Sequence, residues 1–247
     1  MNVYPPPRSP ASTATKRQRC LRRSAATAAL CLWATGCVPQ SGVGRATTLE
    51  PGKHQLTVAL EPAVVTPKFS PTKAVSLPYV LPVLSYRRGL TGRLELGIRV
   101  WGIHTVNFLD SYGGSLDTKV QLYRSKSWHI AAAGAAGYHT LVLGGAHWHV
   151  GHMTLPLLLG ANLGDHQLVL GPRIALGVLG AYGMNPVPTY WGGLSVGFAW
   201  RVGRIVQLFP EVVWLYSPVR FGGEDTTSKE RSVNLLSLGL GVAVDLP

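Results

Sequence analysis

Apolar residues alternate with polar or small residues along most of the chain after about residue 54. The clearest case is the stretch 236–245, where leucine or valine at every second position alternates with serine, glycine, alanine and aspartate. A period of two is typical of β-strands whose two faces meet different surroundings. The same alternation predicts about ten strands, near residues 55–61, 77–88, 93–101, 116–123, 128–142, 147–159, 167–177, 194–201, 206–214 and 236–245.

The lengths of these strands favour a membrane protein. A tilted strand crosses the hydrocarbon core of a bilayer in about 9 to 11 residues, whereas strands of soluble domains are usually about 5 or 6 residues long. Most of the predicted strands are long enough to cross, although the facing of the stretch 77–88 is ambiguous. We therefore predict an all-β fold, an up-and-down antiparallel transmembrane β-barrel of about 10 strands, with roughly 8 to 12 as the range.

The connections between the strands alternate in length. Tight links are expected at residues 89–92, 125–127, 162–165 and 202–203, and long, turn-rich links at 66–76, 104–113, 179–188 and 218–230. The link near Gly144 and Gly145 is short and breaks the alternation. Outer-membrane barrels have short periplasmic turns and longer outer loops. The alternation therefore predicts that both ends of the barrel lie in the periplasm.

The N-terminal stretch has the parts of an export signal. Six basic residues and no acidic one lie before Cys37, and a short apolar run follows the basic residues at 25–33. The tetrapeptide that ends at Cys37, Ala-Thr-Gly-Cys, resembles a bacterial lipoprotein signal in which the Cys37 thiol is acylated. We interpret residues 1–36 as a cleaved signal peptide, 37–53 as the lipidated N-terminus and a periplasmic tether, and 54–247 as the barrel.

Cleavage changes the counts of cysteine and charge. Cys37 would be the single cysteine of the mature chain, which excludes an intramolecular disulfide framework. The formal charge of the precursor is +12, from 23 Lys plus Arg and 11 Asp plus Glu. Removal of the six leading basic residues leaves 17 against 11, a net charge of +6. The remaining bases are scattered singly, so the sequence does not favour nucleic-acid binding.

The predicted inner face carries charges of both signs, which indicates a hydrogen-bonded and salt-bridged interior. These residues are Glu61, Glu95, Arg99, Asp117, Lys119, Arg173, Arg201, Glu211 and Asp245. Because a barrel of about ten strands is only slightly wider than one that its own side chains fill, we favour a plugged interior over a narrow pore or a ligand site. Aromatic residues near the strand ends are interpreted either as interfacial girdles or as lumen plugs: Trp101, Tyr123, Trp128, Tyr190, Trp191, Trp200, Trp214 and Tyr216.

Histidines form the one candidate metal cluster. His147 and His149 lie two apart on a predicted strand, a spacing at which two imidazoles can share a zinc or copper ion. His152 follows three residues later, and His139 lies across a predicted hairpin. The same strand face continues with apolar residues, so an interfacial position for His147 and His149 is the favoured alternative, and no metal site is predicted.

No catalytic motif is found in the sequence. It contains no nucleophile elbow, P-loop, zinc-protease motif or dinucleotide fingerprint. His104 and Asp110, in one predicted outer connection, are the residue types used by barrel proteases, but such pairs occur by chance in many loops. We therefore predict that the protein is not an enzyme, has no catalytic residues and needs no cofactor.

From about residue 53 to residue 246 the pattern resembles outer-membrane β-barrel proteins of Gram-negative bacteria, in particular small lipid-anchored ones without a characterised activity. The resemblance implies an integral outer-membrane protein with its lipid on the periplasmic side, and outer-membrane lipid and the outer-membrane assembly machinery as partners. The expected role is structural, in surface interaction, or as a narrow pore. The alternative is a periplasmic lipoprotein with a soluble β-barrel that binds an apolar ligand, in which Leu236, Leu238 and Leu240 would point inward.

Overall fold

The computed structural model describes residues 39, 42, 44–70, 73–74, 76–105, 109–143, 146–181, 186–219 and 231–246. They form ten long strands and one of two residues: β1 His54–Ser70, β2 Lys73–Ala74, β3 Leu77–Thr91, β4 Leu94–Thr105, β5 Leu109–Arg124, β6 Trp128–Leu143, β7 Ala146–Leu163, β8 His166–Ala181, β9 Val187–Val202, β10 Val206–Val219 and β11 Arg231–Leu246. Within these residues, no helix is long and apolar enough to cross a membrane. Cys37 and the predicted signal peptide lie outside the described residues.

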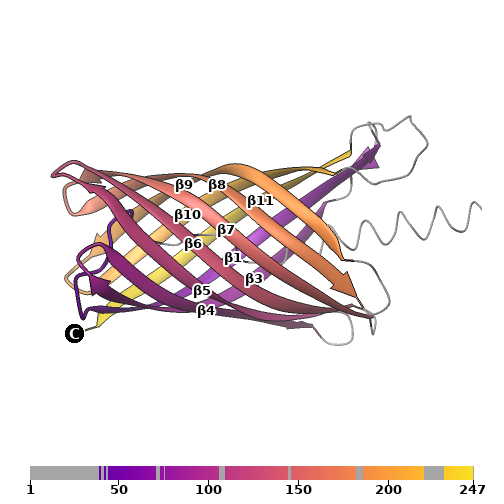
Figure 1. The fold of residues 1–247 in the computed structure, drawn as a ribbon, viewed down its shortest axis with the longest axis horizontal. Coiled ribbons are helices and arrows are strands. Elements are labelled where there is room, and N and C mark those ends of the chain that lie inside the picture. Colours follow the sequence, from indigo (N-terminus) through magenta and orange to yellow (C-terminus); the bar gives the residue numbers. More distant parts are fainter. Residues whose placement is uncertain are drawn as a thin grey trace, which may run out of the picture.

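The ten long strands close into an antiparallel barrel. Each pairs with its neighbours in the order of the sequence, and β11 pairs with β1, from Leu246 opposite His54 to Ser232 opposite Lys68. The tilted strands wrap around the long axis of the molecule in Figure 1. Closure satisfies the backbone N–H and C=O groups between strands, so no sheet edge is left exposed. The predicted up-and-down barrel of ten strands is confirmed.

Four tight connections lie together at one end of the barrel, which we call the turn end. They are residues 92–93, 125–127, 164–165 and 203–205, and they match the four tight links predicted from the sequence. Gly164 and Gly203 have φ values of +66° and +72°, which glycine adopts without the steric cost of a side chain. The last residues of β11 lie at the same end, on the left of Figure 1.

The strands extend further toward the opposite end than the sequence analysis predicted. Residues 104–113 were expected to form a long connection, but β4 continues to Thr105 and β5 begins at Leu109. That prediction was wrong because serine and glycine in this stretch were read as turn residues. Gly113 instead lies in a crowded part of the wall, where an added Cβ would lie 2.4 Å from the Cβ of His139 and 2.8 Å from a ring carbon of Trp101.

The outer face of the barrel is apolar. Leu236, Leu238 and Leu240 on β11 are 53%, 39% and 50% exposed, so they point outward, as the membrane interpretation requires and against the soluble alternative. Exposed leucine, valine and isoleucine side chains recur on the other long strands as well. Six of the eight aromatic residues considered for a girdle are outward and exposed, whereas Trp101 and Trp191 are buried inside.

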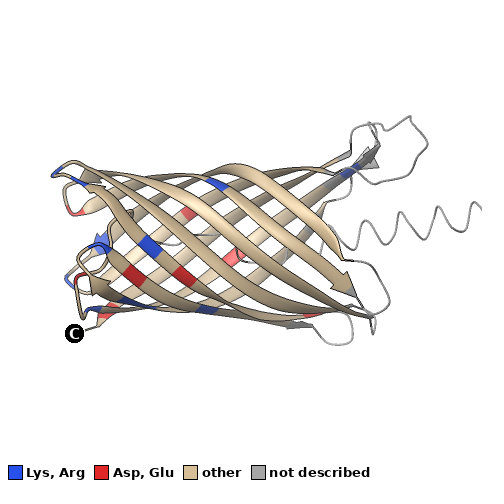
Figure 2. Ribbon diagram, viewed as in Figure 1, with Lys and Arg blue, Asp and Glu red and all other residues tan. Residues whose placement is uncertain are grey.

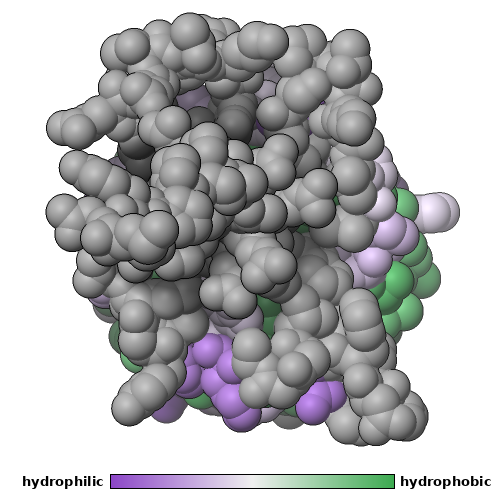
Figure 3. All heavy atoms as spheres, turned by 90° about the vertical axis from the view of Figure 1, so that its right-hand side faces the viewer, coloured by the Kyte–Doolittle hydropathy of each residue, from purple (hydrophilic) through white to green (hydrophobic). Residues whose placement is uncertain are grey.

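The inner face changes character along the barrel axis. Toward the turn end it carries charged and amide side chains, and toward the opposite end it carries buried apolar ones such as Leu81, Leu179, Leu215 and Leu235. Charged residues in Figure 2 accordingly lie mostly at the turn end and the middle of the barrel. Figure 3 views the opposite end, where hydrophobic side chains of the outer wall appear at the side of the molecule.

Candidate functional site

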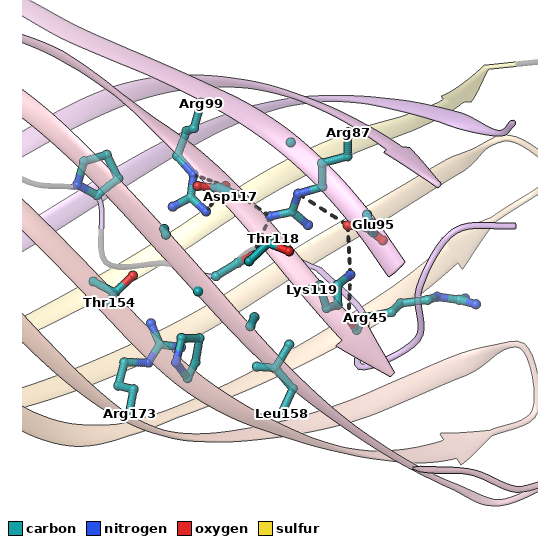
Figure 4. Close-up of a pocket in the computed structure, with 17 residues that line it drawn as sticks. Arg45, Arg87, Glu95, Arg99, Asp117, Thr118, Lys119, Thr154, Leu158 and Arg173 are labelled. Atoms are coloured by element: carbon teal, nitrogen blue, oxygen red, sulfur yellow. Dashed lines mark hydrogen bonds and ion pairs between the residues drawn. The ribbon is translucent and has the colours of Figure 1, made fainter. Parts of the chain in front are cut away.

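A cluster of five charged side chains lies on the inner face of three adjacent strands (Figure 4). We call it the charged cluster, and it consists of Arg87 on β3, Glu95 and Arg99 on β4, and Asp117 and Lys119 on β5. The spacing of two or four residues within each strand places these side chains on one face. The sequence analysis included four of the five among the inward residues, so the structure confirms their facing.

Strand register determines which of these charges pair. Glu95 is directly opposite Lys119, and the Lys119 ammonium lies 3.1 Å from the Glu95 carboxylate. Asp117 accepts two hydrogen bonds from the Arg99 guanidinium, at 2.7 and 3.1 Å, and a third from the Ser115 hydroxyl at 2.8 Å. Charged side chains this deeply buried are stable only when paired and hydrogen-bonded. The register therefore supplies the partners that burial requires.

Gly97 allows Arg87 to join the two pairs. Gly97 lies opposite both Arg87 and Asp117 in the sheet, and a Cβ at this position would lie 2.9 Å from the Cγ of Arg87. The Arg87 guanidinium approaches Glu95 at 3.8 Å and Asp117 at 4.0 Å. The sequence analysis did not include Arg87, because two adjacent arginines in a stretch with ambiguous facing do not show which of them points inward.

A second buried ion pair lies on strands of the other wall. Arg173 on β8 donates a hydrogen bond of 2.7 Å to Glu211 on β10 and another to Ser195 on the intervening strand β9. Both charges were predicted to face inward, and both are buried. Glu61 on β1 is also buried and accepts a hydrogen bond of 2.7 Å from Ser237.

The chain segment before β1 lies inside the barrel, against both sets of charges. We call Gly42 and residues 44–49 the lumenal segment. A Cβ at Gly42 would lie 3.7 Å from both Arg173 and Glu211, and the Gly42 carbonyl accepts a hydrogen bond of 2.9 Å from Arg87. Residues 37–53 were expected to form the lipidated N-terminus and a periplasmic tether; within that stretch the lumenal segment lies against the inner wall, whereas residues 50–53 are exposed.

Side chains of the wall hold the backbone of the lumenal segment. Lys119 donates to the carbonyls of Arg45 and Thr47, both at 3.2 Å, and the amide of Leu49 donates to Glu95 at 3.0 Å. The amides of Ala46 and Thr48 donate to the side-chain oxygens of two glutamines, Gln167 and Gln121, at 2.7 and 3.1 Å. Ala46 is fully buried. The segment is therefore part of the packed interior.

Little space remains at this level of the lumen. A cavity of about 50 Å³ is lined by the charged cluster, Arg173 and the lumenal segment, as Figure 4 shows. The charged cluster and the lumenal segment therefore leave room for only a few water molecules at the centre of the barrel.

The four candidate histidines do not come together. His147 and His149 point outward and are exposed, and the His149 ring stacks on Tyr138. His139 and His152 instead lie beside Trp101 on the other side of the wall. The four histidines considered from the sequence are therefore divided between the two faces of the wall. Among the described residues no group of three or more His, Cys, Asp or Glu side chains is placed to hold a metal ion.

The pair considered for a protease-like site is brought into register. His104 on β4 and Asp110 on β5 are directly opposite each other near the ends of their strands. The side chain of His104 lies outside the described part of the structure, so the pairing concerns the backbone only.

Fold and interior together define a closed antiparallel β-barrel of ten strands with a charged and occupied centre. No protein-family model matches the chain, and no curated protein matches it. Among solved structures it is similar in fold to an outer-membrane channel from Pseudomonas putida F1, with a TM-score of 0.56 at 12% identity over 84% of this chain and 100% of that one.

Two further solved structures are similar with lower TM-scores. One is the outer membrane protease OmpT from Escherichia coli, with a TM-score of 0.47 at 8% identity over 81% of this chain and 100% of that one. The other is the translocator domain of the autotransporter NalP from Neisseria meningitidis, with a TM-score of 0.41 at 14% identity over 94% of this chain and 97% of that one. At 12% identity the likeness to the Pseudomonas putida channel shows the barrel fold alone, and no activity follows from any of the three structures.

Proposed function

We propose that this chain is an integral outer-membrane β-barrel protein, without enzymatic activity, whose interior is closed by its own lumenal segment. Its expected role is structural or in surface interaction, with the connections at the end opposite the turn end as the contact surfaces. The proposal has three parts, which are insertion in the membrane, closure of the lumen, and lipidation of Cys37.

Insertion is supported by the apolar outer face, which is the observation that carries the proposal. Each long strand exposes aliphatic or aromatic side chains on the outside, with Trp128 and Tyr138 on β6, while the buried charges point inward. In water such a surface would be an extensive exposed apolar patch, whereas in a bilayer it is the surface that lipid requires. Exposed Trp128, Tyr190 and Trp200 suit the aromatic belts found at membrane interfaces.

Closure is supported by the small size of the central cavity and by the contacts of the lumenal segment. About 50 Å³ between the charged cluster and Arg173 is too little for a hydrated ion with its shell of several waters. A narrow pore is the second candidate. It is favoured by one observation, namely that the lumenal segment contacts the wall through side-chain hydrogen bonds and not through strand pairing, so it can leave without opening the sheet.

Lipidation of Cys37 is supported by the sequence that precedes it, and the lumenal segment limits how it can occur. Cys37 is five residues before Gly42, which lies beside Arg173 and Glu211 in the lumen. Five extended residues span at most about 17 Å. We therefore expect acylated Cys37 to stay close to the lumen for as long as the lumenal segment stays in place.

Two measurements on the same preparation test insertion and closure. Membranes that contain the protein are washed with urea, and the retained protein is run on gels with and without heating. We expect it to stay in the membrane fraction and to be heat-modifiable; release by urea would contradict insertion. In planar bilayers we expect the wild type to show no conductance at any voltage. Steady conductance would contradict a closed lumen and favour the narrow pore.

A Cys37→Ala variant tests the third part. We expect it to lose incorporation of labelled palmitate while any assembled barrel remains integral in the membrane. Retention of the label would show that Cys37 is not the acylated residue, and release of a folded barrel into the soluble fraction would contradict the integral-barrel proposal.

A further inference from the structure

A wide vestibule opens inside the barrel at the turn end, next to the lumenal segment. Its volume is about 840 Å³, and it lies between residues 45–50 and the inner sides of the turns at 125–126, 164–165 and 204–205. Ligand pockets of proteins commonly have volumes of about 300 to 1,000 Å³. The vestibule is therefore large enough to hold a small solute, in contrast to the small cavity at the centre of the barrel.

The lining of the vestibule has an excess of positive charge. Seven cationic side chains line it, namely Arg45, Lys53, Lys119, Arg124, Lys126, Arg201 and Arg204, against four carboxylates, Glu50, Glu95, Asp165 and Asp245. The formal balance is +3 before any contribution from its histidines. A concave site with charges of mainly one sign attracts and concentrates solutes of the opposite sign.

Two of the four carboxylates are engaged by other groups. Glu95 is paired with Lys119 and accepts the amide of Leu49. Asp245 accepts hydrogen bonds from the side-chain amides of Gln55 and Gln207, at 2.8 and 2.7 Å. When the Glu95–Lys119 pair is set aside, six cations and three carboxylates of the lining remain, which is still an excess of three positive charges.

The arginines of the vestibule are held by carbonyl oxygens instead. Arg45 donates to the carbonyl of Asp165 at 2.6 Å, and Arg201 donates to the carbonyl of Arg204 at 2.7 Å. Within the described residues, no ion pair of 4.0 Å or less involves Arg45, Arg124, Arg201 or Arg204. Carbonyl groups fix the direction of a guanidinium but leave its charge uncompensated.

The lack of a partner for the guanidinium charge is clearest at Arg45. Its Nε is buried and has no hydrogen-bond partner. Burial and the nearby charge of Arg201 lower the pKa of Arg45, while Asp245 and Asp165 raise it. An anion with several oxygens placed between Arg45 and Arg201 would relieve the repulsion and accept hydrogen bonds from both, in the geometry that favours arginine for phosphate recognition.

We infer that the vestibule is a binding site for a small polyvalent oxyanion of the phosphate or pyrophosphate class, held between Arg45 of the lumenal segment and the arginines of the turns. The barrel wall separates this site from lipid, so the ligand is a soluble ion and not a lipid headgroup. Because Arg45 belongs to the lumenal segment, the bound anion also holds that segment in the lumen. This inference goes beyond the proposed closed barrel, which stands without it.

Calorimetric titration of the full-length, detergent-solubilised protein with inorganic pyrophosphate tests the site. We expect saturable binding of one pyrophosphate per chain, weakened about ten-fold or more when two charged donors are removed in Arg201→Gln/Arg204→Gln. The matched control is Arg93→Gln, which removes an exposed arginine from a turn at the same end that does not line the vestibule. It should bind pyrophosphate as the wild type does.

Three outcomes would overturn the inference: no saturable binding to the wild type, unchanged affinity in the double variant, or an equal loss in Arg93→Gln. If the double variant is not heat-modifiable and therefore not folded, Arg45→Gln takes its place with the same expected loss. A separate titration uses phosphatidic acid in mixed micelles; saturable binding of this lipid, with no binding of pyrophosphate, would replace the soluble ligand by a lipid headgroup. Membrane insertion and conductance are read independently, so failure of binding leaves the closed barrel untouched.

Discussion

The two halves of the lumen are built on the same strands but are stabilised in different ways. Along β10, the inward Gln207 and Glu211 lie toward the turn end on either side of Phe209, and Val213 and Leu215 follow toward the other end, before Ser217. Along β11, Ser237 is followed toward the other end by Leu235. Barrels of the outer membrane usually have a polar interior, so the apolar half is the unusual one.

The difference shows where specificity of structure is needed. In the apolar half, contact with almost any apolar neighbour stabilises buried leucine and valine, so the side chains there need only fill the available volume. In the charged half, each buried ion needs a partner with the right geometry, or it destabilises the fold. The lumenal segment lies at the charged half, where Gln121, Glu95 and Lys119 offer donors and acceptors to a backbone that has no strand partner.

The largest expected effect comes from breaking the charged cluster at Lys119. A Lys119→Met variant leaves the buried Glu95 carboxylate without its closest cation and removes two bonds to the lumenal segment. Removal of one partner of a buried ion pair typically costs about 3–5 kcal/mol. We expect a loss of this size in the free energy of urea unfolding, measured from the heat-modifiability of the protein on gels. We also expect measurable conductance in planar bilayers.

Lys126→Met is the control for this variant, because Lys126 lies in an exposed turn. It makes the same chemical change without a buried partner and should stay within about 0.5 kcal/mol of the wild type. Equal stability of both variants would show that the charged cluster does not hold the barrel together.

In the apolar half the expected effect is on stability alone. Leu235→Ala removes a side chain that is 1% exposed and should destabilise the barrel by about 2–5 kcal/mol in the same urea titration. Leu236→Ala is the matched control, since Leu236 is the next residue on the strand and is 53% exposed toward the outside. We expect Leu235→Ala to show no conductance in planar bilayers. Conductance like that of Lys119→Met would show that the two halves of the lumen do not differ in how they close the barrel.

A smaller effect is expected at Gly97, where the absence of a side chain lets Arg87 cross between strands. Gly97→Ala places a Cβ 2.9 Å from the Arg87 side chain, which must shift away from Glu95 or Asp117. Overpacking of this kind costs about 1–3 kcal/mol. Gly151→Ala is the control because its Cβ would meet nothing within 4 Å. If urea unfolding of the two variants is the same, Gly97 is not needed for the position of Arg87.

The sequence predicted the wall of the barrel well, because alternation reports directly on the two faces of a strand. All ten strands and the four tight turns were found, and the structure confirms that Glu95, Lys119 and Glu211 point inward. Where both faces are apolar, alternation carries no information. This explains the ambiguous facing of β3, whose inward Leu81 and outward Leu84 are alike in polarity.

The contents of the lumen could not be predicted in the same way. The lumenal segment is short and contains two glycines, Gly42 and Gly44, a composition equally typical of an exposed tether. Its position depends on glutamine, lysine and glutamate side chains that are 46 to 121 residues away in the sequence. Such long-range pairing becomes visible only once the strand register brings those side chains to one level of the barrel.

The central claim, that the lumenal segment closes the barrel from within, is tested most directly by a disulfide between Ala46→Cys and Gly160→Cys. A Cβ at Gly160 would lie 2.7 Å from the Cβ of Ala46, so the two positions are within reach of a disulfide after a small adjustment. We expect mild oxidation of the membrane-embedded double variant to join the two peptides in the mass spectrum, and neither single variant to do so. Absence of the crosslink in a heat-modifiable double variant would place the segment outside the lumen and contradict the account.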